Sequence, residues 1–201
     1  MSPLDRALLL LTGILAAYQV AVGINGFDTL PVIAYTIAFG VLLVAGLLLI
    51  IWGFDVLDSP VVAIVSTVIP LSLSLGLVWE HLASFRTPYL LFAILGFAVV
   101  IFTRSAPIPA ENRMPTIVIV IVHGIAGIVI FLLPIVISAR GQVGPAFALV
   151  GIGGALIGLG GLLLSFLKTG RPILSRGTIL KVLPGLLLLM TVCFVAGFKY
   201  G

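Results

Sequence analysis

The chain has 201 residues, of which 62% are hydrophobic and only 8% charged, and its formal net charge is +4 at pH 7. Soluble domains carry roughly a quarter charged residues, so this composition excludes a water-soluble globular fold and leaves no polar stretch for a second domain. The basic residues are scattered between apolar runs and not clustered with aromatics, which argues against a nucleic-acid surface. We therefore expect one all-α membrane domain over residues 1–201, with the lipid bilayer as its solvent.

Seven apolar runs approach the length of about 20 residues that a helix needs to cross a bilayer. The predicted transmembrane helices are, in chain order, residues 7–24, 31–54, 60–79, 88–102, 115–139, 145–167 and 179–198. Five of them open with proline, which is tolerated at the first helical position because the missing N–H has no partner there. The first run is longer than the apolar region of a typical signal peptide, so we interpret it as a span.

The charges between the spans predict the orientation of the chain. Lys and Arg in short loops are retained on the cytoplasmic side of a membrane. With seven spans, the side of the N-terminus carries Arg6, Arg104, Arg113, Lys168, Arg171, Arg176 and Lys181, and the other side carries Arg86, Arg140 and Lys199. This asymmetry predicts a cytoplasmic N-terminus and an external C-terminus.

An internal repeat is suggested when the chain is aligned with itself at an offset of 114 residues. Prolines and glycines then coincide at corresponding depths: Pro31 with Pro145, Gly40 with Gly154, Gly46 with Gly160, and Pro70 with Pro184. The alternative is the chance identity of two membrane segments with similar composition. A true duplication predicts a 3+1+3 plan, with repeats at residues 1–87 and 115–201 in the same orientation and a linker helix within residues 88–114.

This 3+1+3 organisation resembles that of the SWEET sugar transporters and of the trimeric intracellular cation channels. The resemblance is limited to organisation. The Pro-Gln motif of the SWEET transporters is absent from this chain, and we find none of the motifs of the cation channels. No family is assigned on this basis, and no residue role is transferred.

His123 is the clearest ionisable residue inside an apolar run, and such residues are candidates for function because an unpaired polar group in hydrocarbon is costly. Gly124 and Gly127 follow it and would allow a neighbouring helix to approach closely. One interpretation is a contact with a ligand, a haem iron or a proton in an internal cavity. The other is a neutral imidazole hydrogen-bonded to a backbone carbonyl or a hydroxyl.

A second polar group, Glu80, His81 and Arg86, lies at the end of the third span. These residues are either solvated charges beside a headgroup-level aromatic, Trp79, or an outer vestibule in which Glu80 and Arg86 pair and gate a pore. His81 and His123 are expected at different depths, which argues against one haem held by both. We expect no resident cofactor and no metal site.

The remaining polar candidates are hydroxyl and amide groups. Pro70 frees a carbonyl in the third span, and nearby hydroxyls would bind it in a kinked helix, which makes Ser72 and Ser74 candidates to line a substrate cavity. Tyr18 and Gln19 are similar candidates in the first span. The Asp58-Ser59-Pro60 segment has the form of a helix start and not of a cation site.

The sixth span is rich in glycine, and Gly154 and Gly158 form a GxxxG pattern that is typical of close helix packing within or between protomers. No arrangement suits an enzyme, since the sequence has no HExxH or GxSxG motif and no acidic pair at membrane depth. The single cysteine, Cys193, is expected to be buried and inert.

Three functions follow as hypotheses. The first is a passive transporter or channel for a small neutral or weakly polar solute, favoured by the repeat and by the absence of a deep carboxylate for coupling. The second is a non-catalytic subunit or assembly factor of a larger membrane complex, or a homo-oligomer, favoured by short loops and glycine-rich faces. The third is a protein that binds a quinone, a lipid or haem through His123.

Overall fold

The computed structural model describes residues 1–109, 112–168 and 174–201, without the side chains of residues 58, 60, 162 and 164–168. Within these residues the chain is helical and has no strand. The α-helices are α1 (Pro3–Val22), α2 (Thr29–Trp52), α3 (Pro60–His81), α4 (Arg86–Ser105), α5 (Met114–Ala139), α6 (Ala148–Lys168) and α7 (Arg176–Tyr200). Short 3-10 helices occupy Phe54–Asp58, Ala83–Phe85 and Pro145–Phe147.

Six of the described helices, all but α6, have the length and apolar composition needed to cross a membrane. In the region of α6, the apolar stretch found among the described residues is Pro145–Gly161. The expectation of an all-helical, multi-pass membrane protein therefore agrees with the structure. Two of the basic residues used to predict orientation cannot be placed: the side chain of Lys168 and all of Arg171 lie outside the described part of the chain.

The ends of the helices follow local rules. At the start of α1, Ser2 and Asp5 form a capping box, in which Ser2 N–H donates to Asp5 Oδ2 at 2.7 Å and Asp5 N–H donates to Ser2 Oγ at 3.1 Å. Gly23 and Gly53 end α1 and α2 with φ of 72° and 75°, which side chains other than glycine rarely adopt. At the start of α3, Ser59 occupies the N-cap without a side-chain capping bond.

Helix α4 is longer than its apolar run of residues 88–102, because it includes charged residues at both ends. Arg86 reaches back to the Trp79 carbonyl, and Arg104 reaches the Pro115 carbonyl at 3.4 Å. Long basic side chains can thus satisfy their charge while their stems remain along an apolar surface. This is why a count of apolar residues alone makes the fourth span too short.

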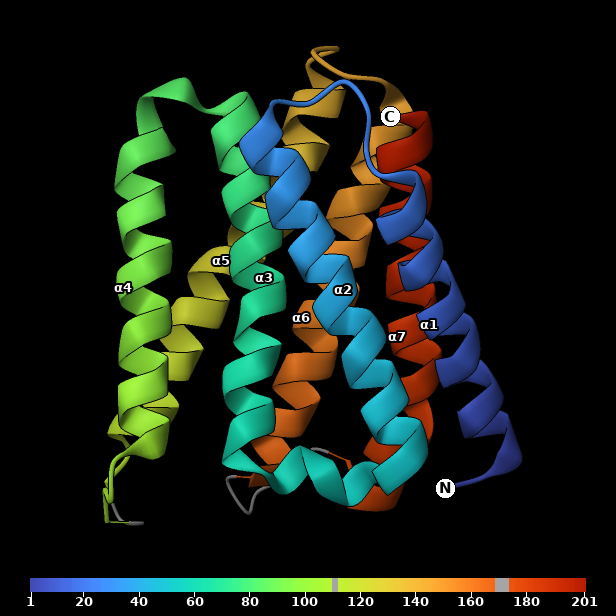
Figure 1. Cartoon of the computed structure of the whole chain (residues 1–201), viewed down its shortest axis with the longest axis vertical. Helices are drawn as coiled ribbons and strands as arrows, with labels where there is room; N and C mark the ends of the chain where they lie inside the picture. Colours follow the sequence, from blue (N-terminus) through green and yellow to red (C-terminus); the bar gives the residue numbers. More distant parts are fainter. Residues whose placement is uncertain (110–111, 169–173) are drawn as a thin grey trace.

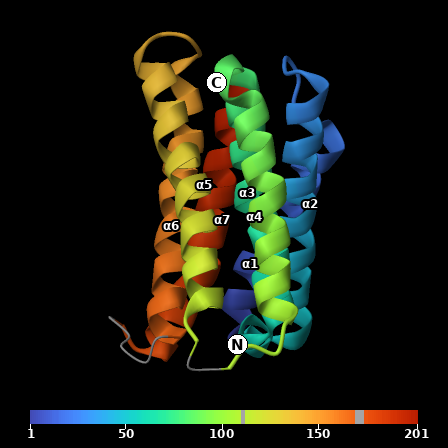
Figure 2. The same cartoon turned by 90° about the vertical axis from the view of Figure 1, so that its left-hand side faces the viewer.

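Six helices form a closed ring, in the order α1, α2, α3, α5, α6, α7 and back to α1 (Figure 1). Helix α4 stands outside this ring and packs on α3 and α5 (Figure 2). The N-terminus lies at one end of the bundle, here called the lower end, and the C-terminus at the other, the upper end, as oriented in Figure 1. Successive helices alternate in direction, so α1, α3, α5 and α7 all run toward the upper end.

The main core fills the ring, and its largest side chains are aromatic. Tyr35, Phe39, Phe147 and Phe194 are buried at 2% exposure or less. A smaller core joins α4 to the ring through Leu71 of α3, Ala93 and Val100 of α4, and Val122 and Ala126 of α5. Helix α4 is otherwise open on its outer face, with only 11% of its apolar window buried inside the protein.

Glycine brings α5 and α6 together at one level of the ring but not at the next. A Cβ atom on Gly154 would lie 2.9 Å from the backbone of Ile130 and Phe131, whereas nothing lies within 4 Å of a Cβ on Gly158. The first glycine of the GxxxG pattern is therefore in a helix interface within the chain. The second faces open space.

We expect Gly154→Ala to destabilise the protein by about 1–3 kcal/mol, because its methyl group would meet backbone that cannot move aside easily. Gly158→Ala is the matched control in the same helix, and it should be neutral or stabilise by up to about 1 kcal/mol through better helix propensity. Thermal unfolding of both variants in the same detergent measures the difference. Equal melting temperatures for the two variants would contradict the α5–α6 packing.

Candidate functional site

The upper end of the bundle gathers the predicted vestibule residues Glu80, His81 and Arg86, because α3 ends and α4 begins there. A fourth residue, Asp28 at the N-cap of α2, joins them. Its backbone N–H donates to Glu80 Oε2 at 3.3 Å, and its carboxylate lies 3.7 Å from the Arg86 guanidinium. The carboxylate that pairs with Arg86 is thus Asp28, and Glu80 holds the backbone of the same residue.

Arg86 has two further contacts, both with Trp79. Its Nε donates to the Trp79 carbonyl, and its guanidinium carbon lies 5.6 Å from the centre of the indole ring. The ion pair with Asp28 is solvent-accessible, with exposed side-chain fractions of 37% and 62%, so it contributes little. A charge-assisted bond to the carbonyl and a cation–π contact are the stronger links between α3 and α4.

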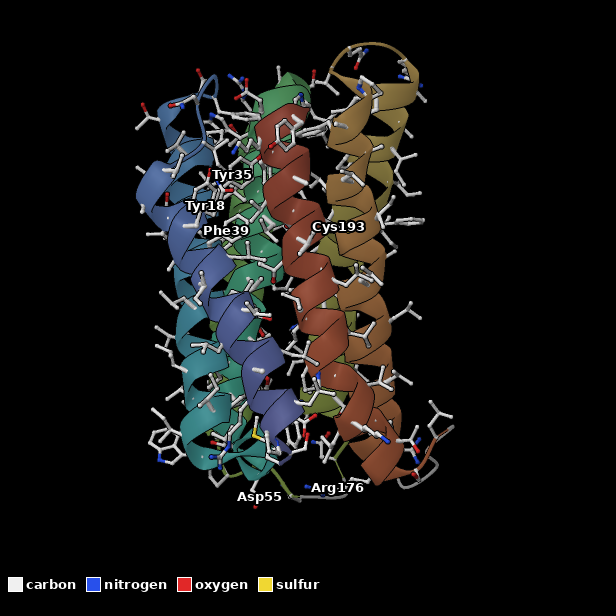
Figure 3. All side chains as sticks on the ribbon, turned by 90° about the vertical axis from the view of Figure 1, so that its right-hand side faces the viewer. Tyr18, Tyr35, Phe39, Asp55, Arg176 and Cys193 are labelled. Carbon is white, nitrogen blue, oxygen red and sulfur yellow. The ribbon has the colours of Figure 1, made fainter. Side chains whose placement is uncertain are left out.

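An aromatic cluster adjoins this polar group, and the His81 ring belongs to both. The His81 ring meets Phe147 at 5.5 Å and Phe27 at 6.3 Å between ring centres. Tyr35 meets Phe198 at 4.6 Å, and Phe147 meets Phe198 at 5.9 Å. Figure 3 shows Tyr35 and Phe39 inside the bundle, between the helix ribbons.

Two polar atoms of this cluster have no hydrogen-bond partner among the described residues: the Tyr35 hydroxyl and His81 Nε2, both buried. An unsatisfied buried polar group costs about 1–3 kcal/mol, so atoms of this kind are points where a small polar molecule gains by binding. Tyr35 was not predicted, because a tyrosine within an apolar run has no feature that separates it from a packing residue. Its burial at 0% exposure is decided by Gly76, which leaves room for its ring.

The hydroxyls of α3 are used within the helix. Ser74 is buried and donates to the Pro70 carbonyl at 2.6 Å, and Thr67 donates to the Ala63 carbonyl at 2.7 Å. These bonds do not go to the carbonyl of Ser66, which Pro70 deprives of its usual partner. The helix continues through Pro70. Ser72 is half-buried on the same helix.

The Tyr89 hydroxyl of α4 points toward Ser74 without completing a hydrogen bond. It is a third buried polar atom that lacks a partner in the described part of the chain. Tyr89 therefore places an unused hydroxyl beside α3, at the boundary between the ring and α4.

His123 lies half-buried in the lower half of α5. Its Nδ1 is 3.2 Å from the Ile119 carbonyl, one helical turn earlier, which agrees with an imidazole bound to backbone. The charge that acts on it most directly is Arg104 of α4. Nothing lies within 4 Å of a Cβ atom on Gly124 or Gly127, so these glycines are not at a helix contact within the chain.

The two candidate residues of α1, Tyr18 and Gln19, lie in different environments. Tyr18 is partly exposed, and its hydroxyl accepts a hydrogen bond from Lys199 Nζ at 3.1 Å, while Lys199 also lies 5.5 Å from the ring centres of Tyr18 and Tyr200. Gln19 is buried and donates to the Gly23 carbonyl at 2.7 Å. Tyr18 thus links the first helix to the last, and Gln19 closes the end of its own helix.

Two cavities of the described part are lined mainly by apolar side chains. A closed void between α2, α3 and α7 has no room for a water molecule and is lined by Ala38, Phe39, Leu42, Ile69, Leu73 and Phe194. An open depression of about 520 Å³ lies on α4 and is lined by Ala98, Ile101, Phe102, Ser105 and Ala106. Among the described residues, no group of three or more His, Cys, Asp or Glu side chains could hold a metal ion.

Comparison with known proteins finds no family model that matches the chain. It also finds no curated protein and no solved structure that matches. The residues above are therefore assigned from their own contacts. The strongest concentration of polar and aromatic contacts is the upper end, where α2, α3, α4, α7 and the 3-10 helix Pro145–Phe147 contribute.

We expect Arg86→Ala to cost about 1–3 kcal/mol of stability, because it removes the bond to the Trp79 carbonyl and the contact with the indole ring. Asp28→Asn removes only the exposed ion pair and should cost less than about 1 kcal/mol. Arg86→Lys keeps the charge without the planar fork and should fall between them. Chemical unfolding in micelles measures all three, and a larger loss for Asp28→Asn than for Arg86→Ala would refute the assignment.

Proposed function

We propose that this chain is a passive transporter or channel for a small neutral or weakly polar solute, with its path through the ring between two three-helix units, α1–α3 and α5–α7. One observation carries the proposal. The neighbour relations of the ring are unchanged when α1, α2 and α3 are exchanged with α5, α6 and α7. Under this exchange the contacts of α2 with α1 and α3 become the contacts of α6 with α5 and α7. The contact of α1 with α7 becomes the contact of α5 with α3.

This exchange has the form of a parallel repeat, with an axis along the membrane normal. Helix α4 is the element that such a plan requires, since it returns the chain to the side on which the second unit must begin. The offset of 114 residues pairs Pro70 in α3 with Pro184 in α7, inside the last helix of each unit. Two units that meet along two interfaces support a mechanism in which one unit tilts against the other.

The aromatic contacts support a closed state at the upper end. Tyr35 with Phe198, Phe39 with Phe194, and His81 with Phe147 each join a ring of the first unit to a ring of the second. We infer that the solute would enter from the lower end and that separation of these rings would open the upper end.

The chemistry of the interior supports a solute without a full charge. In the described part of the chain, acidic side chains lie at helix ends or in loops, and the ring offers apolar side chains, aromatic faces and the unpaired Tyr35 hydroxyl. The Tyr35 hydroxyl and His81 Nε2 would provide hydrogen bonds to a neutral polar solute at the closed end. A charged solute would lose its hydration with little in return.

A second candidate is a non-catalytic subunit or assembly factor of a larger membrane complex. It is favoured by the bonding of buried hydroxyls within their own helices, since such bonds leave these donors unavailable to a solute. The bonds join Thr12 to Leu8, Thr67 to Ala63, Ser74 to Pro70, and Thr191 to Leu187. Flux measurements separate the two candidates.

The transport proposal predicts that a cross-link between the units at the upper end stops flux. We would replace Tyr35 and Phe198 by cysteine in a Cys193→Ala background, reconstitute the protein in liposomes, and follow glycerol, urea and hexose entry by light scattering. A short bifunctional thiol reagent should abolish flux, and a reductant-cleavable version should restore it on reduction.

The matched control for the cross-link is Phe27→Cys with Tyr35→Cys, whose rings are 5.7 Å apart and belong to one unit. Its cross-link should leave flux unchanged, because it does not join the moving parts. Flux that persists in the cross-linked Tyr35/Phe198 variant would refute the mechanism. No flux above protein-free liposomes for any of these solutes would favour the subunit candidate.

We also propose that the lower end, with the N-terminus, faces the cytoplasm, because Arg6, Arg104, Arg113, Arg176 and Lys181 lie there. In a bacterial host, alkaline phosphatase fused to the C-terminus should be active and a fluorescent protein fused there should be dark. A fluorescent protein at the N-terminus should be bright. The reverse pattern would show that the basic loops face outward.

A further inference from the structure

The lower end of α4 carries an arginine whose hydrogen-bonding capacity is largely unused. Arg104 Nη2 donates to the Pro115 carbonyl at a long 3.4 Å, and its Nε is buried without a partner in the described part of the chain. The arginines Arg86 and Arg176 pair with Asp28 and Asp55. Among the described residues, no carboxylate lies within 4.0 Å of the Arg104 guanidinium.

Two further sources of positive potential lie close to Arg104. The start of α5 is adjacent, as the bond to the Pro115 carbonyl shows, and a helix N-terminus carries the positive end of its dipole. Arg113, the N-cap residue of α5, is exposed at the same end. Together these groups make the α4–α5 corner attractive to an anion.

The same turns of α4 present an apolar depression on the outer face of the bundle. Its volume is about 520 Å³, and it is lined by Ala98, Ile101, Phe102, Ser105 and Ala106. Phe102 is 70% exposed, and α4 stands outside the ring, so this surface meets the bilayer and not another helix of the chain (Figure 2). An arginine with unused donors and an apolar depression on the same turns of α4 match a molecule with an anionic head and a hydrocarbon tail.

We propose that the lower corner of α4 and α5 binds an anionic phospholipid, with its phosphate on the Arg104 guanidinium and an acyl chain in the depression on α4. The planar guanidinium suits two phosphate oxygens at once, and among the described residues its terminal nitrogens make only the long bond from Nη2 to the Pro115 carbonyl. Arg113 and the α5 dipole favour a headgroup with net negative charge over a zwitterionic one. The site does not depend on the transport proposal.

The test uses the full chain, delipidated in detergent and titrated with phosphatidylglycerol or phosphatidylcholine of the same acyl chains, with bound lipid counted by native mass spectrometry. Wild type should bind phosphatidylglycerol more tightly. Arg104→Gln should weaken that binding by about tenfold, the loss expected for a charge-assisted bond. Arg104→Lys should recover part of it. Arg140→Gln, which removes an exposed arginine at the upper end, is the matched control and should bind as wild type.

The depression is tested separately by Ala98→Trp, which fills an exposed apolar site and leaves every charge in place. This variant should weaken phosphatidylglycerol binding without removing its salt dependence. Inorganic phosphate should not raise the melting temperature as the lipid does. The proposal is overturned if Arg104→Gln binds like wild type, if Arg140→Gln loses as much, if the two lipids bind equally, or if inorganic phosphate stabilises the protein as well as the lipid does.

Discussion

Contacts between aromatic rings at the upper end of the bundle join the two halves of the ring, and much of the remaining structure is arranged around them. Tyr35 and Phe39 come from α2, and Phe194 and Phe198 from α7, so the contact spans the interior of the ring. Aromatic rings supply large buried area and prefer the edge-to-face and tilted geometries seen here. In a lipid solvent, where burial of apolar surface gives no driving force between helices, such packing contacts hold a bundle together.

Small residues decide where those rings fit. Gly76 faces Tyr35, Gly153 faces Phe194, and Gly197 lies against the backbone of α6. Each of these positions would clash with even one added carbon atom. The close contacts are concentrated in the upper half, while several glycines of the lower half face open space. Some glycines of this chain are therefore required by close helix contacts and others are not, and the number of glycines in the sequence does not tell the two kinds apart.

Polar residues follow a similar division. Hydroxyls inside the bundle donate to carbonyls of their own helices, so they are satisfied without a partner on a neighbouring helix. The polar contacts between distant segments lie at the ends of the bundle. At the upper end, Arg86 joins the end of α3 to the start of α4 and Asp28 joins α2 to both; at the lower end, Arg176 pairs with Asp55. Polar bridges at the ends of the bundle avoid the desolvation that the same contacts would require at its centre.

The sequence by itself determined the helices, because a bilayer requires long apolar runs with internally satisfied backbone, and those runs are visible in composition. It also located the polar group at Glu80, His81 and Arg86, and the helix start at Pro60. It did not identify Asp28 as the partner of Arg86, Tyr35 as a buried hydroxyl, or Arg104 as a residue with a buried, unpaired nitrogen. All three contacts depend on which helix faces come together. A helix that is apolar on all sides has little periodicity in its sequence to show which face is buried. Only the tertiary structure decided the ring, the place of α4 outside it, and which glycines are in contact, because side-chain packing between helices fixes all three.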